Sequence, residues 1–238
     1  MRGKEKTMAG KLYGIGVGPG DPELLTLKAK RLIEEADIVA VPVKKIGENS
    51  VALNIAKQAA DIPDEKIVEI EFTMNKDKIK REACRKEAAK KVTDILDEGK
   101  NVAMLALGDI GIYSTYAYVH NILINQGYEV QMISGIPSFC AGASAANISL
   151  VEGNDGFGVI PSLRGIEDVQ RALNVFDNLV IMKVGNHVQE VYNLLRERNI
   201  EKNAVIVSNC GMEDEYIGEL IPDRKYGYFT TMIVKKEN

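Results

Sequence analysis

The chain has 238 residues, of which 45% are hydrophobic and 27% charged, and its formal net charge is -4. This composition is typical of one large or two small globular domains and excludes a largely disordered chain. The negative charge, with no long segment dense in Lys and Arg, argues against a binder of duplex nucleic acid, which needs cations to neutralise phosphates. No apolar run reaches the roughly 20 residues that cross a bilayer, so we expect no membrane partner.

The opening segment "MRGKEKTMAGK" is charged and lacks the apolar stretch of a secretory signal. We therefore expect a short leader or frayed end, and a cytoplasmic location. Cys84, Cys140 and Cys210 are odd in number and far apart, which favours reduced thiols over a disulfide framework. No pair of them has metal-ligand spacing, so we expect no metal site.

The first part of the chain alternates predicted strands and helices. The predicted strands are residues 11–18, 37–43, 66–72 and 101–107, and the helices are 22–36, 48–60 and 76–100. In the first helix, Asp21 is the expected N-cap and Pro22 the first helical residue. The side chains expected to face inward there are Leu24, Leu25, Leu27, Leu32 and Ile33. Gly99 should end the third helix. This order predicts a mostly parallel sheet with right-handed crossovers.

The second part repeats the alternation less regularly. Helices are predicted at 114–127, 138–149, 165–176 and 187–199, and strands at 128–134, 156–162, 178–184, 203–209, 216–221 and 228–236. No low-complexity linker separates the two parts. We expect the domain boundary near Gly111, which gives domains of residues 1–111 and 112–238.

The stretch "GIGVGPGD" joins the first predicted strand to the first helix and resembles a phosphate-binding loop. A P-loop requires Lys and Ser or Thr where this chain has Asp21 and Pro22. A dinucleotide fingerprint requires a third glycine where this chain has Pro19 or Asp21, and an acid after the next strand, which is absent. A phosphate site is therefore disfavoured. A tight structural turn and a loop that faces another ligand both remain open.

Two further loops, "LALGDIGIYSTY" and "SGIPSFCAGASAA", also follow predicted strands, where ligands dock on parallel sheets. Gly108 and Gly111 allow close backbone approach, and Asp109 offers an acceptor for hydroxyls or an ammonium. Equally, Asp109 could cap a turn and Ser114 the following helix. The small residues of the other loop suit either a planar ligand or a helix packing face.

These segments, with "LVIMKVG" (179–185) and "IVSNCGMEDE" (206–215), resemble the tetrapyrrole methylase family of S-adenosylmethionine-dependent methyltransferases. The resemblance covers nearly the whole chain and is greatest to the branch that methylates C20 of precorrin-2 or cobalt-factor II. It implies an α/β fold of two α/β domains, with a mostly parallel N-terminal sheet and a mixed C-terminal sheet. It also implies a homodimer, a tetrapyrrole substrate, and S-adenosylmethionine in a cleft between the domains.

The resemblance also implies site residues. The donor contacts are Pro19, Leu107, Gly108, Asp109, Ile112, Pro137, Ser138, Met182 and Cys210, with Val184 an alternative to Met182. The substrate contacts are Gly18, Pro19, Gly20 and Asp21 of the first loop. The implied substrate carries carboxylates on flexible arms, so cations should line its site, and Lys44 and Lys183, with Lys45 and Arg164, lie near loops that could do so. The alternative for each of these cations is a solvated surface charge. This chain departs from the family at Pro137 and Ser138, which replace a Thr-Ala or similar pair, and at Ile110, which replaces a proline.

A methyl on a sulfonium is already activated, so the reaction mainly requires alignment of donor and acceptor. We assign no catalytic acid or base: Asp109 is a candidate for positioning and Tyr113 for polar contact, while His120 and His187 are expected to be packed or solvated. Alternatives are a uroporphyrinogen-III C2/C7 methyltransferase, another precorrin methylase, or diphthine synthase. A non-catalytic nucleotide-binding domain is the alternative from a different class. The sequence leaves open whether the substrate holds cobalt.

Overall fold

The computed structural model describes residues 9–73, 75, 77–161 and 163–236. The expected leader or frayed end, residues 1–8, lies outside the described residues. The chain divides into two compact units, Met1–Ile136 and Pro137–Asn238. The division falls after Ile136 and not near Gly111, because the strand that follows Gly111 pairs with the first strand of the chain. That strand therefore completes the first unit.

The first unit contains a five-stranded sheet in the order β3-β2-β4-β1-β5. The strands are β1 (Leu12–Gly16), β2 (Ile38–Val43), β3 (Ile67–Glu71), β4 (Val102–Ala106) and β5 (Val130–Ile133). All four pairings are parallel. The loops that follow the five strands therefore leave the sheet at one edge, which we call the carboxyl edge of the first sheet.

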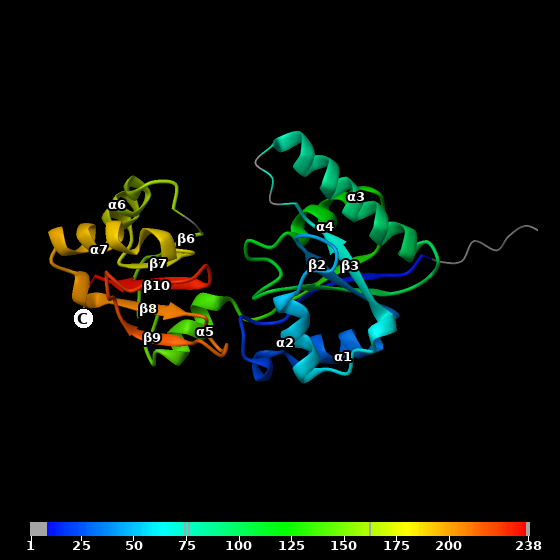
Figure 1. The fold of residues 1–238 in the computed structure, drawn as a ribbon, viewed down its shortest axis with the longest axis horizontal. Helices are drawn as coiled ribbons and strands as arrows, with labels where there is room; N and C mark the ends of the chain where they lie inside the picture. The colour runs from blue at the N-terminus through cyan, green and yellow to red at the C-terminus, as the bar shows by residue number, and fades with distance from the viewer. Residues whose placement is uncertain (1–8, 74, 76, 162, 237–238) are drawn as a thin grey trace, which may run out of the picture. The chain divides into compact units, whose positions relative to one another are not determined.

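Helices cover both faces of this sheet (Figure 1). They are α1 (Leu27–Glu35), α2 (Val51–Ala59), α3 (Lys78–Leu96) and α4 (Tyr116–Asn125), with short 3-10 turns η1 (Pro22–Leu24) and η2 (Asp64–Lys66). Ile15 and Leu105 pack with α1 and α2, whereas Met104 and Ala106 pack with α3 and α4. The side chains of β4 therefore alternate between two apolar layers, as its continuous apolar sequence predicts.

The predicted helix 22–36 is two elements. The Asp21 carboxylate accepts the amide two residues on, at 2.8 Å, and so caps η1 as expected, but the chain then leaves helical geometry at Leu25. Thr26 caps α1 through its hydroxyl. The break changes the helical phase, so Leu27 is 87% exposed and the prediction that it faces inward is wrong. The break occurs because two capping side chains lie within six residues of each other.

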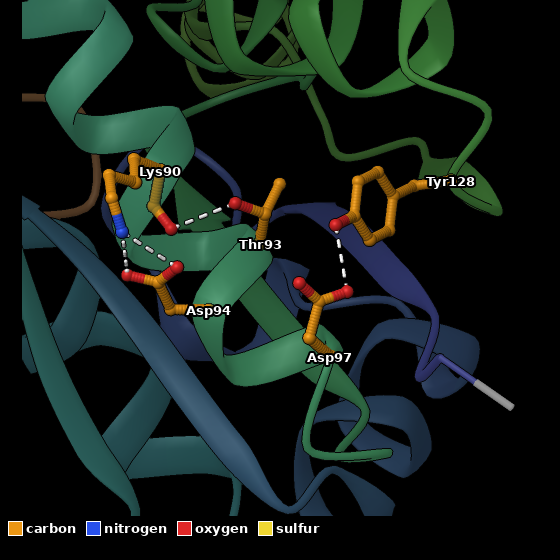
Figure 2. A network of polar contacts seen from close by, with 5 residues as sticks. All are labelled: Lys90, Thr93, Asp94, Asp97 and Tyr128. Atoms are coloured by element: carbon orange, nitrogen blue, oxygen red, sulfur yellow. Dashed lines mark hydrogen bonds and ion pairs between the residues drawn. The ribbon is translucent and has the colours of Figure 1, made fainter. Parts of the chain in front are cut away.

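The end of α3 is fastened at the opposite, amino edge of the sheet (Figure 2). The hydroxyl of Tyr128, which precedes β5, donates to Asp97 at 2.8 Å, and this bond raises the pKa of Tyr128. The Lys90 ammonium lies 2.6 Å from Asp94, and the Thr93 hydroxyl donates to the Lys90 carbonyl. These contacts serve the fold, because the site candidates lie elsewhere.

The second unit contains a mixed five-stranded sheet in the order β6-β7-β10-β8-β9 (Figure 1). The strands are β6 (Phe157–Ile160), β7 (Asn178–Met182), β8 (Ala204–Ser208), β9 (Tyr216–Glu219) and β10 (Thr230–Lys235). The pair of β6 and β7 is parallel and the other three pairs are antiparallel. The prediction of a parallel first sheet and a mixed second sheet is confirmed.

One face of the second sheet packs against α6 (Ile166–Val175) and α7 (Val188–Glu197), and the other against α5 (Ser138–Ala145). Short 3-10 turns, η3 (Gly185–His187) and η4 (Glu201–Asn203), precede α7 and β8. Gly142 allows α5 to approach β8, since a Cβ there would lie 3.2 Å from Val207. The small residues of α5 therefore form a packing face. Across the described ranges of the chain, no helix is both long and apolar enough to cross a bilayer.

Candidate functional site

Three loops meet at the carboxyl edge of the first sheet. We call them the first loop (17–21), the second loop (107–115) and the third loop (134–136). Gly18 and Gly108 form an isolated antiparallel bridge, with N–O distances of 3.1 and 2.8 Å. Their φ angles are 80° and 73°, in the left-handed region that glycine adopts without strain. The bridge fastens the first loop to the second.

The third loop joins them through a contact that only glycine permits. A Cβ on Gly135 would lie 2.3 Å from the Gly108 carbonyl oxygen, and a Cβ on Gly16 would lie 2.6 Å from the same atom. Both distances are too short for any side chain. Three backbone segments from distant parts of the sequence are therefore in direct contact here.

The Asp109 carboxylate adds a second connection between these loops. One oxygen accepts the Gly111 amide at 2.8 Å, and the other accepts the Gly135 amide at 2.9 Å. The first bond is the turn cap that the sequence left open, and the second ties the second loop to the third. The hydroxyl of Ser114 accepts the Tyr116 amide at 3.2 Å, but the residue at the N-cap of α4 is Thr115 and not Ser114. Contact between Asp109 and a donor stays a prediction.

Beside this junction the second loop is accessible. Gly108 itself is buried, and both its amide and its carbonyl are bonded to Gly18. Ile112 is 40% exposed and Tyr113 56% exposed, whereas Ile110 is buried. The second loop thus offers the side chains of Ile112 and Tyr113 to a ligand.

The other predicted residues of the first unit differ in accessibility. Gly18, Pro19 and Gly20 are buried, and Asp21 is half-buried while it caps η1. Lys44 and Lys45, which follow β2 at the carboxyl edge, are exposed. The first loop therefore acts as a fixed support in the structure, and its contact with substrate stays a prediction.

In the second unit, Met182 ends β7 and Cys210 follows β8, and both pack against the cluster formed by α5. Pro137 and Ser138 begin that helix. The structure therefore relates these four predicted donor contacts to one face of the second sheet. Val184, the alternative to Met182, is fully buried on the opposite face, which favours Met182 as the contact.

Sequence reasoning missed Tyr228, since the predicted strand 228–236 included it. In the structure β10 begins at Thr230, which leaves Tyr228 58% and Phe229 36% exposed just before the strand. The Tyr228 ring centroid lies 5.4 Å from the Lys183 ammonium. The available signal was the aromatic pair directly after Gly227.

Both histidines have local partners. The ring of His120 lies 3.2 Å from the Tyr116 hydroxyl, and that of His187 lies 3.4 Å from Glu190. Burial raises the pKa of Tyr116 well above its ordinary value. In the part of the chain that the structure describes, no three His, Cys, Asp or Glu side chains form a group that could hold a metal ion.

Comparison with known proteins gives the family. The sequence model of one protein family, the tetrapyrrole (corrin/porphyrin) methylases, matches residues 11–220. The chain belongs to the tetrapyrrole methylase family. This tetrapyrrole methylase is 35% identical over 231 residues to a Methanocaldococcus jannaschii protein named "Probable cobalt-precorrin-2 C(20)-methyltransferase", with 95% of this chain and 96% of that one covered. It is 30% identical to the cobalt-precorrin-2 C(20)-methyltransferase of Salmonella typhimurium, with 97% and 98% covered.

A solved structure shares the fold of this methylase. Uroporphyrin-III C-methyltransferase from Thermus thermophilus, solved with S-adenosylhomocysteine, superposes with a TM-score of 0.68 at 20% identity and covers 95% of this chain and 98% of its own. The donor of the family, S-adenosylmethionine, has a flat adenosine and a charged amino-acid end. The exposed Ile112 and Tyr113 fit such a molecule, because they offer apolar and aromatic surface to the adenosine.

Proposed function

We propose that this tetrapyrrole methylase transfers the methyl group of S-adenosylmethionine to C20 of precorrin-2 or cobalt-factor II during corrin-ring synthesis. The observation that carries the proposal is the near full-length similarity, at 35% and 30% identity, to two proteins named for C(20) methylation of cobalt-precorrin-2. The fold and the glycine-built junction of three loops agree with it.

The second loop supplies the central part of the proposed donor site. The side chains of Leu107 and Ile112, on either side of the Gly108 bridge, would hold the donor. The full proposed set is Pro19, Leu107, Gly108, Asp109, Ile112, Pro137, Ser138, Met182 and Cys210. Asp109 is a positioning residue in this proposal, since both its oxygens hold backbone amides of the loops.

When bound, the donor supplies a methyl group on a sulfonium, so the protein needs no covalent nucleophile. The contribution of this chain is alignment, and a fixed geometry of reacting groups supplies several kcal/mol of a bimolecular barrier. The Gly18–Gly108 bridge, the close contact of Gly135 with the Gly108 carbonyl and the Asp109 bonds supply this fixed geometry. Together they cross-link the first, second and third loops.

The tetrapyrrole would contact the first loop and the cations Lys44 and Lys183, which can pair with its carboxylates. We further propose that the protein is a homodimer, as its resemblance to the family implies, and that it acts in the cytoplasm. Size-exclusion chromatography with light scattering tests the oligomeric state directly.

The deciding experiment incubates the full chain with S-adenosylmethionine and either metal-free precorrin-2 or cobalt-factor II. Mass spectrometry and NMR then identify the methylated carbon. We expect one new methyl group at C20, and the preferred substrate shows whether cobalt is required. Methylation of uroporphyrinogen III at C2 and C7 would contradict the proposal. Donor binding without turnover of any tetrapyrrole would support the non-catalytic alternative.

A further inference from the structure

Backbone strain marks two residues of the candidate site. Five non-glycine residues in the described chain have left-handed φ angles, and three of these are asparagines, which tolerate that conformation. The other two are Tyr113, at 50°, and Lys183, at 58°. A residue other than glycine or asparagine with a left-handed φ angle costs free energy of folding, and such residues concentrate at functional sites. Glycine would relieve the strain at Lys183, so the retained side chain calls for an explanation.

The Lys183 side chain is held over an aromatic ring. Its ammonium lies 5.4 Å from the centroid of the Tyr228 ring, a favourable cation–π distance. Within the described part of the chain, this ammonium has no hydrogen-bond or ion-pair partner. By contrast, Lys235 of the same unit pairs with Glu152 at 2.9 Å. Lys183 thus presents three N–H donors that no neighbouring carboxylate occupies.

The segment 226–229 that carries the ring is rigid despite its exposure. A Cβ on Gly185 would lie 2.4 Å from the Gly227 carbonyl, so the turn after β7 packs directly on this segment. The Thr230 hydroxyl donates to the same carbonyl at 2.8 Å. The Phe229 carbonyl accepts the Asn209 amide at 2.9 Å. The backbone that carries the Tyr228 ring is therefore fastened by three contacts.

This pair lies beside the proposed donor contacts. Lys183 directly follows Met182, and Asn209, bonded to the segment of Tyr228, directly precedes Cys210. All belong to the same edge of the second sheet, where β7 and β8 end and β10 begins. The ammonium is thus positioned for an anionic group of the second reactant.

We infer that Lys183 and Tyr228 form a carboxylate-binding subsite for the tetrapyrrole, with Lys183 as the binding residue and Tyr228 as its positioning residue. The inference rests on the proposed function, which supplies a substrate with carboxylate arms. The ring holds the ammonium in one place, which lowers the entropy lost when a carboxylate binds. Substrate binding by its side chain explains why this position has a lysine, with its strained backbone and unpaired charge, and not a glycine.

The test titrates the full chain with uroporphyrin III, a stable porphyrin with carboxylate arms, and separately with S-adenosylhomocysteine. Lys183→Met should weaken uroporphyrin binding about tenfold, the loss typical of one charge-assisted hydrogen bond. It should also make that binding less sensitive to salt. Tyr228→Leu should weaken binding to a smaller extent, and Tyr228→Phe, which keeps the ring, should restore it. Affinity for S-adenosylhomocysteine should not change.

In methyl transfer, Lys183→Met should raise KM for the tetrapyrrole with little change in kcat. Lys183→Gly should lose the same binding while its unfolding midpoint stays equal or rises, since glycine relieves the strain. The matched control is Lys202→Met, which removes an exposed ammonium at the opposite edge of the second sheet.

The outcomes separate the two proposals. If the wild-type chain neither binds uroporphyrin III nor methylates a tetrapyrrole, the proposed function fails. If the wild type does both and Lys183→Met behaves like Lys202→Met, the subsite is overturned. It is also overturned if Lys183→Met weakens S-adenosylhomocysteine binding, or if Lys183→Gly lowers the unfolding midpoint.

Discussion

At the scale of single residues, Asp109 shows how one carboxylate can organise a site. Sequence reasoning left two roles open for it, a ligand acceptor and a turn cap. The structure shows the cap and adds a bond to Gly135, which is 26 residues away along the chain. The connection to Gly135 could not be predicted from the sequence, because only the pairing of β1 with both β4 and β5 brings the two loops together.

Asp109→Ala should weaken S-adenosylhomocysteine binding by more than about 1 kcal/mol, or about fivefold, because two loop amides lose a charged acceptor. Asp109→Asn should have a smaller effect, since the amide oxygen keeps one of the two bonds. Calorimetry measures both. The control is Asp177→Ala, which removes a similar bond to the Gly156 amide within the second unit. Unchanged affinity in Asp109→Ala would remove Asp109 from the site.

Tyr116 predicts a pH dependence of stability. Burial raises the pKa of this hydroxyl above the unfolded value of about 10, so the folded protein favours the neutral form. Below about pH 10 the buried hydroxyl makes its full contribution to the free energy of unfolding. As the pH rises further, the free energy of unfolding falls by up to about 1.4 kcal/mol per pH unit.

Tyr116→Phe removes this dependence. Urea unfolding of both proteins at pH 8 and pH 10.5 should show the wild type losing more free energy of unfolding than the variant. At pH 8 the variant should be less stable by about 1 kcal/mol, from the lost bond to His120. Equal losses in the two proteins would contradict the prediction.

At the scale of elements, glycines decide how closely helices and strands approach. Tyr116, the first residue of α4, is buried with its ring against the backbone of β1. A Cβ on Gly14 would lie 2.2 Å from that ring. The glycine-rich start of the chain therefore serves packing at Gly14 and loop contacts at Gly16 and Gly18.

Gly14→Ala should destabilise the protein by about 1–3 kcal/mol or more, because the added methyl overlaps the Tyr116 ring. Tyr116→Leu alone should also destabilise it, through a cavity. In the double variant the methyl gains space, so the combined loss should be smaller than the sum of the two single losses. Denaturant unfolding of the four proteins measures this coupling, and strictly additive losses would contradict it.

At the scale of the whole molecule, the candidate donor contacts divide between two units, with the second loop in one and Met182 and Cys210 in the other. The unit boundary follows strand pairing and not the alternation of the sequence. Residues 112–136 supply α4 and β5, which complete the layers of the first sheet.

S-adenosylhomocysteine should slow amide hydrogen exchange in segments of both units, if both supply donor contacts. We expect protection in residues 107–112 and 182–185, and none in residues 128–130 at the amino edge of the first sheet. At about 100 times its Kd the ligand should also stabilise the fold by about 2.7 kcal/mol. Protection confined to one unit would show that the other unit contributes no donor contact.

Local signals, namely apolar runs, helical periodicity and caps, predicted the type and order of most elements and the parallel first sheet, because these signals act over a few residues. The mixed second sheet was expected from the resemblance to the family. The motifs also determined the family, because their residues and spacing are distinctive in themselves.

Contacts between distant residues follow from the three-dimensional fold. Three such contacts join segments far apart in the chain. Gly16 and Gly135 touch the Gly108 carbonyl, the Asp109 carboxylate accepts the amides of Gly111 and Gly135, and the Lys183 ammonium lies over the Tyr228 ring. The physical reason is that strand order and register fix such contacts, and local sequence does not specify them. The unit boundary at Ile136 was decided in the same way, by the pairing of β5 with β1.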